Sequence, residues 1–448
     1  MLRLGIISML LLLDYGFCHT LQHVQVIFRH GERAPTTFIT FPTDPPGIDS
    51  NFPYEHGEMT NNGIWQEFTL GSNLREEYGH LVDFTYRSSQ VGEPNYELMV
   101  FNFQLRIYSG LDNRTITSAQ AMLASFLPPT GNQVWNSALL WQPIPTIAQP
   151  IIDHVSFGVF DHCPAVRNSI ANSDGYAAIF NSHIELVKEL EVKTGLTIPN
   201  LYIFQMEYNV LKELLPLPKW AKSPEFMEEV INVQNDLHRR FIDLFLDSIG
   251  GWHFDQLLGR MDESVDCRTK HKMVFYSGHD TNIMTLGRFL NIDLISSSLL
   301  TYGSYLSIEL HERDKTHFVE MHFHPHLNGS KIKLNITNCP DPCRYSEFRS
   351  LGGRLTSQQW VSTCLGITFD GKCTLFGSVA GGLMILVETS FGLTPCLDVA
   401  HAIALVSRCL EGVPPSLAIS IPSPPKLLIP KPSCVECVLQ IVFTYESI

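Results

Sequence analysis

The residues best suited to chemistry lie in a short basic segment near the start of the chain, Arg29-His30-Gly31-Glu32-Arg33-Ala34-Pro35. Arginine presents a planar set of N–H donors that fits phosphate oxygens, and a histidine beside it can act as a nucleophile. Gly31 lets the backbone approach a ligand closely, and Pro35 stiffens the exit from the segment. The segment therefore predicts a phosphate-binding loop, and an ordinary basic surface turn is the alternative interpretation.

Two apolar runs lead into polar loops. Residues 24–28 precede the basic segment, and the second run is Met273-Val274-Phe275-Tyr276-Ser277-Gly278-His279-Asp280. Both are typical of strands buried on both faces, and open α/β sheets bind ligands beyond the carboxyl ends of their strands. For the second loop, Asp280 as a plain helix N-cap and His279 as a core histidine are the alternatives.

A third candidate cation is Arg114, in the first turn of a predicted helix that ends before Pro128-Pro129. The positive end of a helix dipole opposes a cation, so an arginine there makes best sense if it reaches toward a bound anion. A solvated or salt-bridged arginine is the alternative. Its neighbour Asn113 begins a glycosylation sequon, but we expect it to be folded into the same corner and to be a poor glycan acceptor.

Composition limits the class of protein. The chain has 448 residues, of which 44% are hydrophobic and 17% charged, so it can bury a large core and is not disordered throughout. This length allows two or three domains, or one α/β domain with a large insertion. The formal net charge of -14 repels polyanions, which makes nucleic acid an unfavourable partner and requires any anion site to be locally basic.

Residues 1–18 have the charged start, apolar centre and small residues of a secretory signal peptide. Ten of the 11 cysteines would remain after its removal, and the secretory route favours disulfides. Asn328 and Asn335 each begin a sequon for N-glycosylation. The sequence therefore predicts a lysosomal or extracellular glycoprotein.

The rest of the chain is organised around the two strand–loop units. Residues from about 135 to 260 have a mainly helical pattern and are predicted to form a lobe inserted between these units. Residues 91–104 are predicted to be an irregular insertion. From 366 to 448 the character changes: residues 375–387 are apolar but too short for a normal membrane span, so no anchor can be identified, and several prolines then predict an extended, unpacked tail.

Three histidines, His322, His324 and His326, alternate along a predicted strand pair that covers residues 309–326. Histidines at this spacing could ligate zinc. No carboxylate or cysteine completes such a set locally, so a polar, solvent-facing strand is the favoured interpretation and no metal site is predicted.

Taken together, the motifs resemble those of the histidine acid phosphatase family of the prostatic and lysosomal type. The resemblance runs from about residue 22 to 364. It is carried by four segments in the family's order: the basic segment 29–35, Phe41-Pro42-Thr43-Asp44-Pro45, Asp112-Asn113-Arg114-Thr115, and residues 276–280. It implies an α/β fold with a mixed, mostly parallel sheet flanked by helices and a helical cap, in a domain spanning residues 19–365.

The resemblance also implies site roles. His30 would be the nucleophile that becomes phosphohistidine and Asp280 the acid that protonates the leaving oxygen. The phosphoryl oxygens would be held by Arg29, Arg33, Arg114 and His279. No metal or other cofactor is implied, because the arginines supply the charge. Cys163 would pair with Cys364, and Cys339 with Cys343.

The function predicted is therefore hydrolysis of small phosphate monoesters at acidic pH. Two alternatives stay open: a phosphatase specialised for phytate, a nucleotide or a phosphosugar, and a catalytically silent secreted binding protein. The presence of both His30 and Asp280 argues against silence. A homodimer is compatible with the sequence. Two departures from the family are the insertion at 91–104, which bears on Arg114, and the unfamiliar ending beyond Cys364.

Overall fold

The computed structural model describes most of the chain before residue 353 and four strands beyond it. The described ranges are 20–36, 42, 53–83, 104–149, 152–153, 163, 181–197, 222–243, 246, 250–269 and 271–352, with the backbone of strands at 368–369, 372–378, 384–390 and 439–444. The predicted signal peptide, nearly all of the insertion at 91–104 and the proline-rich stretch after residue 413 lie outside these ranges.

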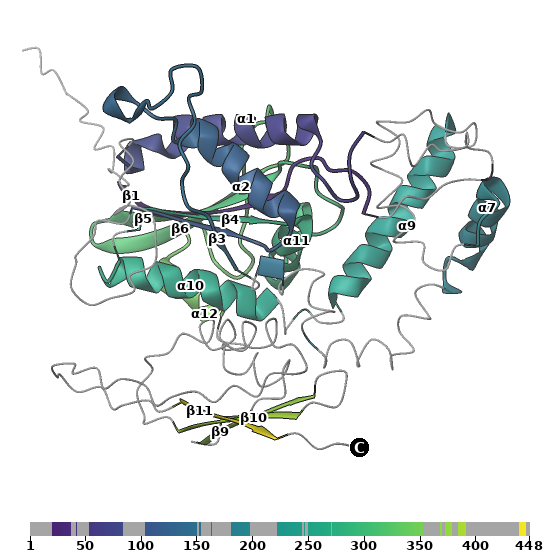
Figure 1. Ribbon diagram of the computed structural model, residues 1–448. Helices are drawn as coiled ribbons and strands as arrows, with labels where there is room; N and C mark the ends of the chain where they lie inside the picture. Colours follow the sequence, from purple (N-terminus) through teal and green to yellow (C-terminus); the bar gives the residue numbers. More distant parts are fainter. Residues whose placement is uncertain are drawn as a thin grey trace, which may run out of the picture.

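One mixed sheet organises the described part of the domain, with strand order β3-β2-β4-β1-β5-β6-β7 (Figure 1). The strands are β1 (Thr20–Arg29), β2 (Leu105–Ser109), β3 (Ile147–Ala148), β4 (Met273–Gly278), β5 (Tyr305–Arg313), β6 (Thr316–His324) and β7 (Ile332–Lys333). Strands β3, β2, β4 and β1 are parallel, whereas β5, β6 and β7 pair antiparallel. The predicted α/β fold with a mixed sheet is confirmed.

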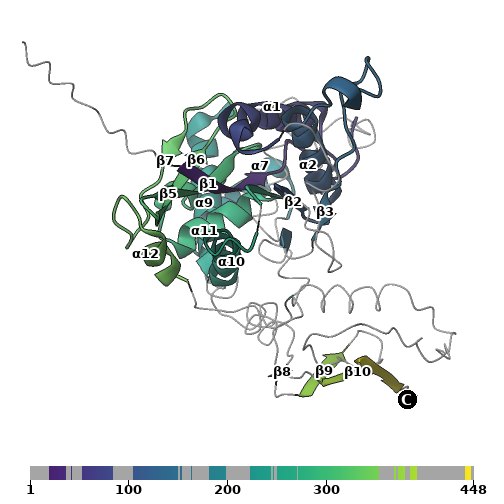
Figure 2. The ribbon, with the colours of Figure 1, turned by 90° about the vertical axis from the view of Figure 1, so that its left-hand side faces the viewer.

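Helices cover both faces of this sheet (Figures 1 and 2). On one face lie α1 (Asn61–Tyr78) and α2 (Asn113–Phe126). On the other lie α10 (Trp252–Val265), α11 (Asp280–Phe289) and the short α12 (Tyr345–Ser350). Within the described ranges, 3₁₀ turns lie at Gly79–Leu81, Gly131–Gln133 and Asp293–Ile295.

Strand β1 is buried on both faces, as its apolar run predicts. Val24, Val26 and Phe28 pack into one core cluster with residues of α1 and α2, whereas Ile27 packs into the other with residues of α10 and α11. Alternate side chains of a strand point to opposite faces, so a single strand serves both cores. This burial fixes the point at which β1 delivers its polar end.

Residues Asn61–Tyr78 have apolar side chains at roughly helical spacing, and α1 has these bounds. Of these side chains Leu70 and Leu74 are buried, whereas Ile64 and Phe68 are exposed. The buried face also includes two glycines: a Cβ at Gly63 would collide with the backbone of Glu32, and one at Gly71 with the backbone of Met122. Close backbone contact at the glycines, together with the two leucines, therefore sets the orientation of this helix.

Two further helices belong to the predicted helical lobe. Helix α7 (Ile184–Thr194) ends at Gly195, whose φ of 71° suits glycine. Helix α9 spans Pro224–Asp243, and residues 244–245 and 247–249, which follow it, lie outside the described residues. Asp243 of α9 accepts two hydrogen bonds from Arg288 of α11, at 2.8 and 2.9 Å, which joins the lobe to the sheet domain. The boundaries predicted for the lobe and the domain stay predictions.

A second sheet lies after residue 366, whereas the proline-rich stretch for which the sequence predicts an unpacked tail lies outside the described residues. Strands β8 (Thr368–Phe369), β9 (Lys372–Ser378), β10 (Met384–Ser390) and β11 (Leu439–Thr444) pair antiparallel in the order β11-β10-β9-β8. The apolar run at 375–387 is thus divided between β9 and β10. Within the described residues, no helix has the length and apolar character needed to cross a membrane.

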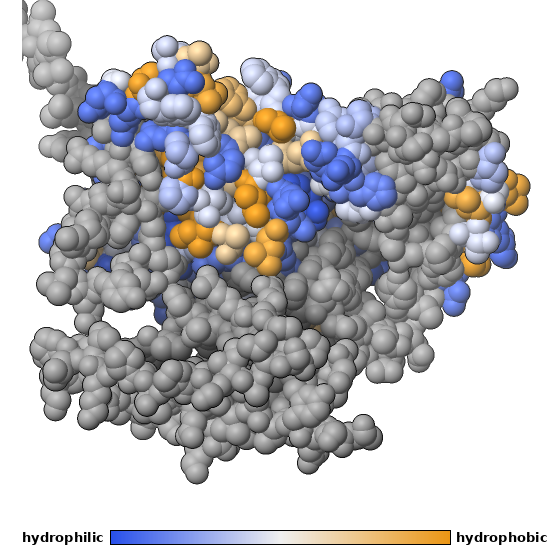
Figure 3. Space-filling view, in the orientation of Figure 1, coloured by the Kyte–Doolittle hydropathy of each residue, from blue (hydrophilic) through white to orange (hydrophobic). Residues whose placement is uncertain are grey.

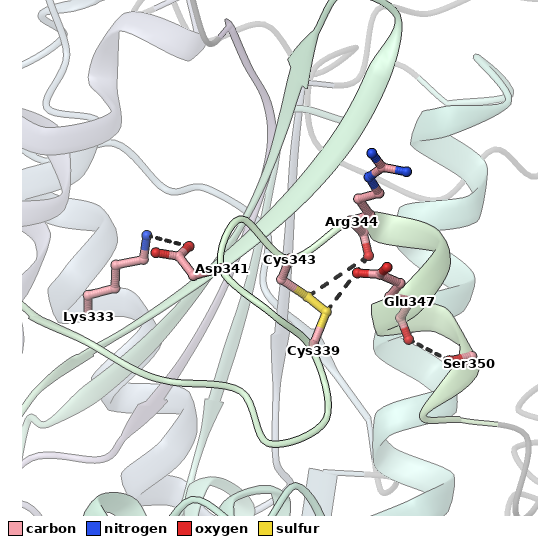
Figure 4. The surroundings of a disulfide bond; sticks show 7 residues. All are labelled: Lys333, Cys339, Asp341, Cys343, Arg344, Glu347 and Ser350. Carbon is pink, nitrogen blue, oxygen red and sulfur yellow. Dashed lines mark hydrogen bonds and ion pairs between the residues drawn. A yellow bond between two sulfur atoms is a disulfide. The ribbon is translucent and has the colours of Figure 1, made fainter.

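The predicted disulfide between Cys339 and Cys343 is present, with a Cα–Cα distance of 5.2 Å (Figure 4). Both sulfurs lie 3.9 Å from the carbonyl oxygen of Arg344, just before α12. Cys163 is fully buried and disulfide-bonded. Its expected partner Cys364 lies outside the described residues, so that pairing stays a prediction.

Candidate active site

The two polar loops meet because β1 and β4 are parallel neighbours. The register pairs Arg29 with Gly278, and the His30 N–H continues the ladder by donating to the carbonyl oxygen of Gly278 at 2.9 Å. His30 therefore lies beside His279 and Asp280, with 5.5 Å between the two imidazole centroids. Residues separated by about 250 positions are thus held together by the main chain of the sheet.

The imidazole of His30 has a defined tautomer. Its Nδ1 lies 2.8 Å from the carbonyl oxygen of Gly31, and a carbonyl can only accept, so Nδ1 carries the hydrogen. In the neutral ring the lone pair is therefore on Nε2. The side chain is 4% exposed, which leaves little room for rotation.

Positive charge surrounds His30. Burial is the main cause that holds the pKa of this imidazole well below 6.5, and the neighbouring Arg114, His279, Arg29 and Arg33 lower it further. His30 is consequently neutral even in acid while the site is empty. A neutral imidazole among cationic groups is suited to attack an anionic electrophile that those groups bind.

Arg29 is fixed from three sides. Its guanidinium donates to the carbonyl oxygen of Leu300, lies 3.1 Å from Asp280 Oδ2, and stands over the ring of Tyr302 at 4.1 Å. A stacked, ion-paired arginine keeps its donors in one orientation. This pre-arranges one wall of the site.

Asp280 begins α11 instead of capping it. The N-cap residue is His279, and Asp280 Oδ1 accepts the N–H of Thr281 at 2.7 Å, so the interpretation of Asp280 as an N-cap is wrong. Burial raises the pKa of Asp280, but Arg29, His238, His279 and the Thr281 N–H outweigh it, so that the net pKa is lowered. Asp280 is therefore ionised before a substrate binds.

Arg33 and Arg114 approach from other elements. Arg33 is 3% exposed and donates to the carbonyl oxygen of Ala34 at 2.8 Å. Arg114 lies in the first turn of α2, as predicted, and forms an ion pair with Asp112. Among the neighbouring cations, Arg114 lowers the pKa of His30 most, which places Arg114 within the cluster. Asn113, however, is exposed, and the expectation that it is folded into this corner is wrong.

His279 has carboxylate partners that the motifs did not reveal. Its Nε2 lies 3.1 Å from Asp153 Oδ1 and 3.5 Å from Asp112 Oδ2. Asp153 is buried and also accepts the N–H of Leu111 at 2.7 Å. Asp112 belongs to one of the sequence motifs, whereas Asp153 follows an Ile-Ile pair that lies outside all of them. These two carboxylates and His279 lie close enough to hold a cation, but Arg114 already pairs with Asp112.

The basic loop is anchored on the start of α1. The N–H of Thr60 donates to the carbonyl oxygen of Glu32 at 3.0 Å, and the N–H of Glu32 donates to Gln66 Oε1 at 2.9 Å. Gly31 has no room for a side chain, because a Cβ there would collide with Gly63. The loop is consequently held against the helix by main-chain contact.

A cavity of about 430 Å³ opens beside the cluster. Arg29, Arg33 and Asp280 line one part of it, and Leu299, Leu300 and Tyr302 form part of its apolar side. The turn after β6, with Asn328, lies at its edge. The cavity has the mixed character of a small-molecule site. The described surface seen in Figure 3 otherwise mixes hydrophilic and hydrophobic residues without one continuous apolar area.

His322 and His324 of β6 do not face solvent: each is 7% exposed, so the solvent-facing interpretation is wrong for these two. His326 lies beyond the strand, is exposed as that interpretation expects, and lines the cavity. His322 lies 3.2 Å from Glu309 and 3.5 Å from Glu320, carboxylates that come from β5 and from β6 itself. Lys331 donates to Glu309 at 2.6 Å, so an ammonium group supplies the positive charge that a metal would bring.

Comparison with known proteins gives one consistent answer. The profile of the histidine phosphatase superfamily (branch 2) matches residues 20–154 and 205–324. Prostatic acid phosphatase of Mus musculus is 29% identical over 380 residues, which are 81% of this chain and 94% of the relative. Lysosomal acid phosphatase of Homo sapiens is 26% identical over 359 residues, 77% of this chain and 80% of the relative.

Solved structures agree on the fold. A phytase of Hafnia alvei in complex with myo-inositol hexakis sulphate superposes with a TM-score of 0.50 at 16% sequence identity. The match covers 74% of this chain and 96% of the phytase. At this identity, the likeness concerns the arrangement of helices and strands.

Proposed function

Because the chain belongs to branch 2 of the histidine phosphatase superfamily, we propose that it is an acid phosphatase that hydrolyses small phosphate monoesters through a phosphohistidine on His30. The observation that carries this proposal is the neutral His30 imidazole, with its lone pair on Nε2, among the cations Arg29, Arg33 and Arg114. Both named relatives are acid phosphatases.

In the first step, His30 Nε2 attacks phosphorus while the ester oxygen leaves on the opposite side. The bond from nitrogen to phosphorus forms, and the bond from phosphorus to the ester oxygen breaks. Phosphoryl transfer depends mainly on position and charge stabilisation, which the three arginines and His279 would provide at the phosphoryl oxygens. A water molecule then attacks the phosphohistidine, releases inorganic phosphate and restores His30.

Asp280 is the proposed acid for the leaving oxygen, but it is ionised in the empty site. The second pKa of a phosphate monoester is about 6, so in acid the substrate arrives with a proton. Binding beside Asp280 brings two anionic groups together, which favours sharing this proton with the carboxylate. The acidic optimum that we propose follows from a substrate that brings the proton, together with a nucleophile that stays neutral.

The secretory features fit the same proposal. Relatives carry the names prostatic and lysosomal acid phosphatase, and the chain has a predicted signal peptide, the Cys339–Cys343 disulfide and sequons at Asn328 and Asn335. We infer a glycoprotein of the lysosome or the cell exterior. Exposed Asn328 lies in a turn at the edge of the cavity, which suits attachment of a glycan.

The test is hydrolysis of nitrophenyl phosphate by purified protein across acidic pH, with a chelator present. We expect turnover in the parent and a loss of at least about a thousandfold in His30→Ala, because no other group can replace the nucleophile. Labelled substrate should leave an acid-labile, base-stable phosphoenzyme in the parent alone. A folded parent without activity or phosphoenzyme would favour the silent binding protein, and full loss with chelator would favour a metal enzyme.

A further inference from the structure

The turn after β6 places a sequon for N-glycosylation at the rim of the active-site cavity. The sequon is Asn328-Gly329-Ser330, and all three residues are exposed. Asn328 lines the same cavity as Arg29 and Asp280. Because Asn328 is exposed, it lies on the side of the cavity that opens to solvent. The sequon at Asn335 is exposed as well, but Asn335 is not among the described residues that line this cavity.

Contacts with two other elements hold this turn in place. Asn73 of α1 donates its side-chain amide to the carbonyl oxygen of Leu327 at 2.7 Å. Thr301, in the loop before β5, donates its hydroxyl to the carbonyl oxygen of Pro325. Thr301 and Leu327 themselves line the cavity. A group attached to Asn328 would therefore stay at the rim.

The size of the cavity separates two classes of substrate. Its volume of about 430 Å³ is that of a small-molecule site, so a free monoester passes the rim completely. A phosphorylated side chain on a folded protein is short, and it reaches the arginines only if the protein surface comes up against the rim. An N-linked glycan is bulky and hydrated and stays on the surface. At the rim it would obstruct the approach of a protein far more than that of a small molecule.

We propose that a glycan on Asn328 acts as a size filter for the active site, an inference that rests on the proposed function. It admits free phosphate monoesters and excludes phosphate groups carried on the surface of folded proteins. Specificity of this kind comes from a clash with the wrong substrate and not from a contact with the right one. Removal of the glycan should therefore raise activity on phosphoproteins and leave activity on small substrates unchanged.

The experiment presents one leaving group in two sizes. Free phosphotyrosine and a folded protein with a single surface phosphotyrosine release the same phenolic oxygen, so the two substrates differ mainly in access. The full chain is secreted from cultured eukaryotic cells that attach N-glycans. The ratio of kcat/KM for the phosphoprotein to kcat/KM for free phosphotyrosine is then the measure of the filter.

Ser330→Ala removes the sequon and leaves the Asn328 side chain in place, and Ser330 is not among the described residues that line the cavity. We expect kcat/KM for the phosphoprotein to rise about fivefold or more, and that for free phosphotyrosine to change less than about twofold. Ser330→Thr is the matched control, because threonine also completes a sequon, and it should keep the parent ratio. The double variant Asn113→Gln/Asn335→Gln removes the other two sequons and should keep the parent ratio as well.

Mass spectrometry of glycopeptides shows whether Asn328 carries a glycan in each protein. If Ser330→Ala is not secreted, endoglycosidase trimming of the folded double variant shortens the glycan on Asn328 alone and should raise the ratio in the same way. An active parent without a glycan on Asn328, or a ratio unchanged when this glycan is removed or trimmed, overturns this proposal alone. A parent that hydrolyses neither phosphotyrosine nor nitrophenyl phosphate overturns the proposed function as well.

Discussion

Two buried clusters in this molecule contain the same kinds of side chain, but their charges are arranged around different central residues. The active-site cluster consists of Arg29, His30, Arg33, Arg114, His279 and Asp280. The Glu309 cluster, on β5 and its neighbours, consists of Glu309, Tyr78, His311, His322 and Lys331. Glu309 accepts from Tyr78 at 2.6 Å, from Lys331 at 2.6 Å and from His311 at 2.8 Å.

The two clusters differ in how burial and the neighbouring charges act on the pKa of the central residue. Burial raises the pKa of Glu309, but its hydrogen bonds with His311, His322, Lys331 and Tyr78 outweigh burial and hold that pKa well below 4.5. At His30, burial and the nearby cations all lower the pKa. Cations gathered around a neutral nucleophile indicate a site for an anion, whereas cations gathered around a buried carboxylate indicate a structural role.

The largest effect that would test this contrast is Asp280→Asn. An acid matters most when the leaving alkoxide is strongly basic, so turnover of glycerol phosphate should fall about 10²- to 10⁴-fold, and that of nitrophenyl phosphate far less. Asparagine can still accept the Thr281 N–H, so the start of α11 should stay intact. Measured kcat values on the two substrates decide: equal fractional losses, or none, would remove Asp280 from the mechanism.

Glu309→Gln should act on stability and not on chemistry. Removal of one partner from a buried ion pair leaves Lys331 with Glu77 alone, and we expect a loss of about 3 kcal/mol in the free energy of unfolding. The matched control is Glu185→Gln on α7, whose ion pair with Lys188 is exposed and should contribute less than about 1 kcal/mol. Urea unfolding measures both. A large loss of kcat in folded Glu309→Gln would contradict the structural role.

The Glu309 carboxylate also makes the stability of the folded state depend on pH, and the direction of this dependence follows from its lowered pKa. Because the folded-state pKa of Glu309 is depressed, its contribution to stability is complete above the unfolded pKa of about 4.3 and decreases as pH falls below that value. The parent should therefore lose stability between about pH 4 and pH 2 more steeply than Glu309→Gln. Melting temperatures across this range check the sign, and parallel curves would show that Glu309 is not the group responsible.

The smallest effect concerns the binding of phosphate at the active-site cluster. Inorganic phosphate should stabilise the parent by about 2.7 kcal/mol at about 100 times its dissociation constant, because it binds only the folded state. Glu309→Gln should gain as much, and Arg33→Ala should gain little. Thermal unfolding with phosphate, against chloride at equal ionic strength, measures this gain, and an equal gain in Arg33→Ala would argue against phosphate binding at this cluster.

The sequence predicted those parts of the site that depend on local pattern. The ends of β1 and β4 follow from apolar runs that stop at polar residues, and these ends bring His30 and Asp280 together. Arg114 was predictable because a cation is unfavourable at the start of a helix. The motifs thus specify the groups proposed to contact the phosphoryl group.

Contacts between distant segments were not predictable in this way. Asp153 lies 126 residues from His279 in the sequence, and no local pattern distinguishes it. His322 resembled a solvent-facing strand residue until β5 placed Glu309 beside it. Ile64 and Phe68 fit a helical apolar pattern with the buried Leu70 and Leu74, but the glycine contacts of α1 leave Ile64 and Phe68 exposed. In each case the deciding partner comes from another element.

The pairing of β1 with β4 determines how this enzyme should lose its activity on heating. The His30 amide is part of the central sheet, since it donates to Gly278 where the two strands end. Proteins open in cooperative units, and a central parallel strand pair is among the last to open. Amide exchange at His30 should therefore be as slow as in the middle of β1, and heat inactivation should coincide with loss of the whole sheet instead of preceding it.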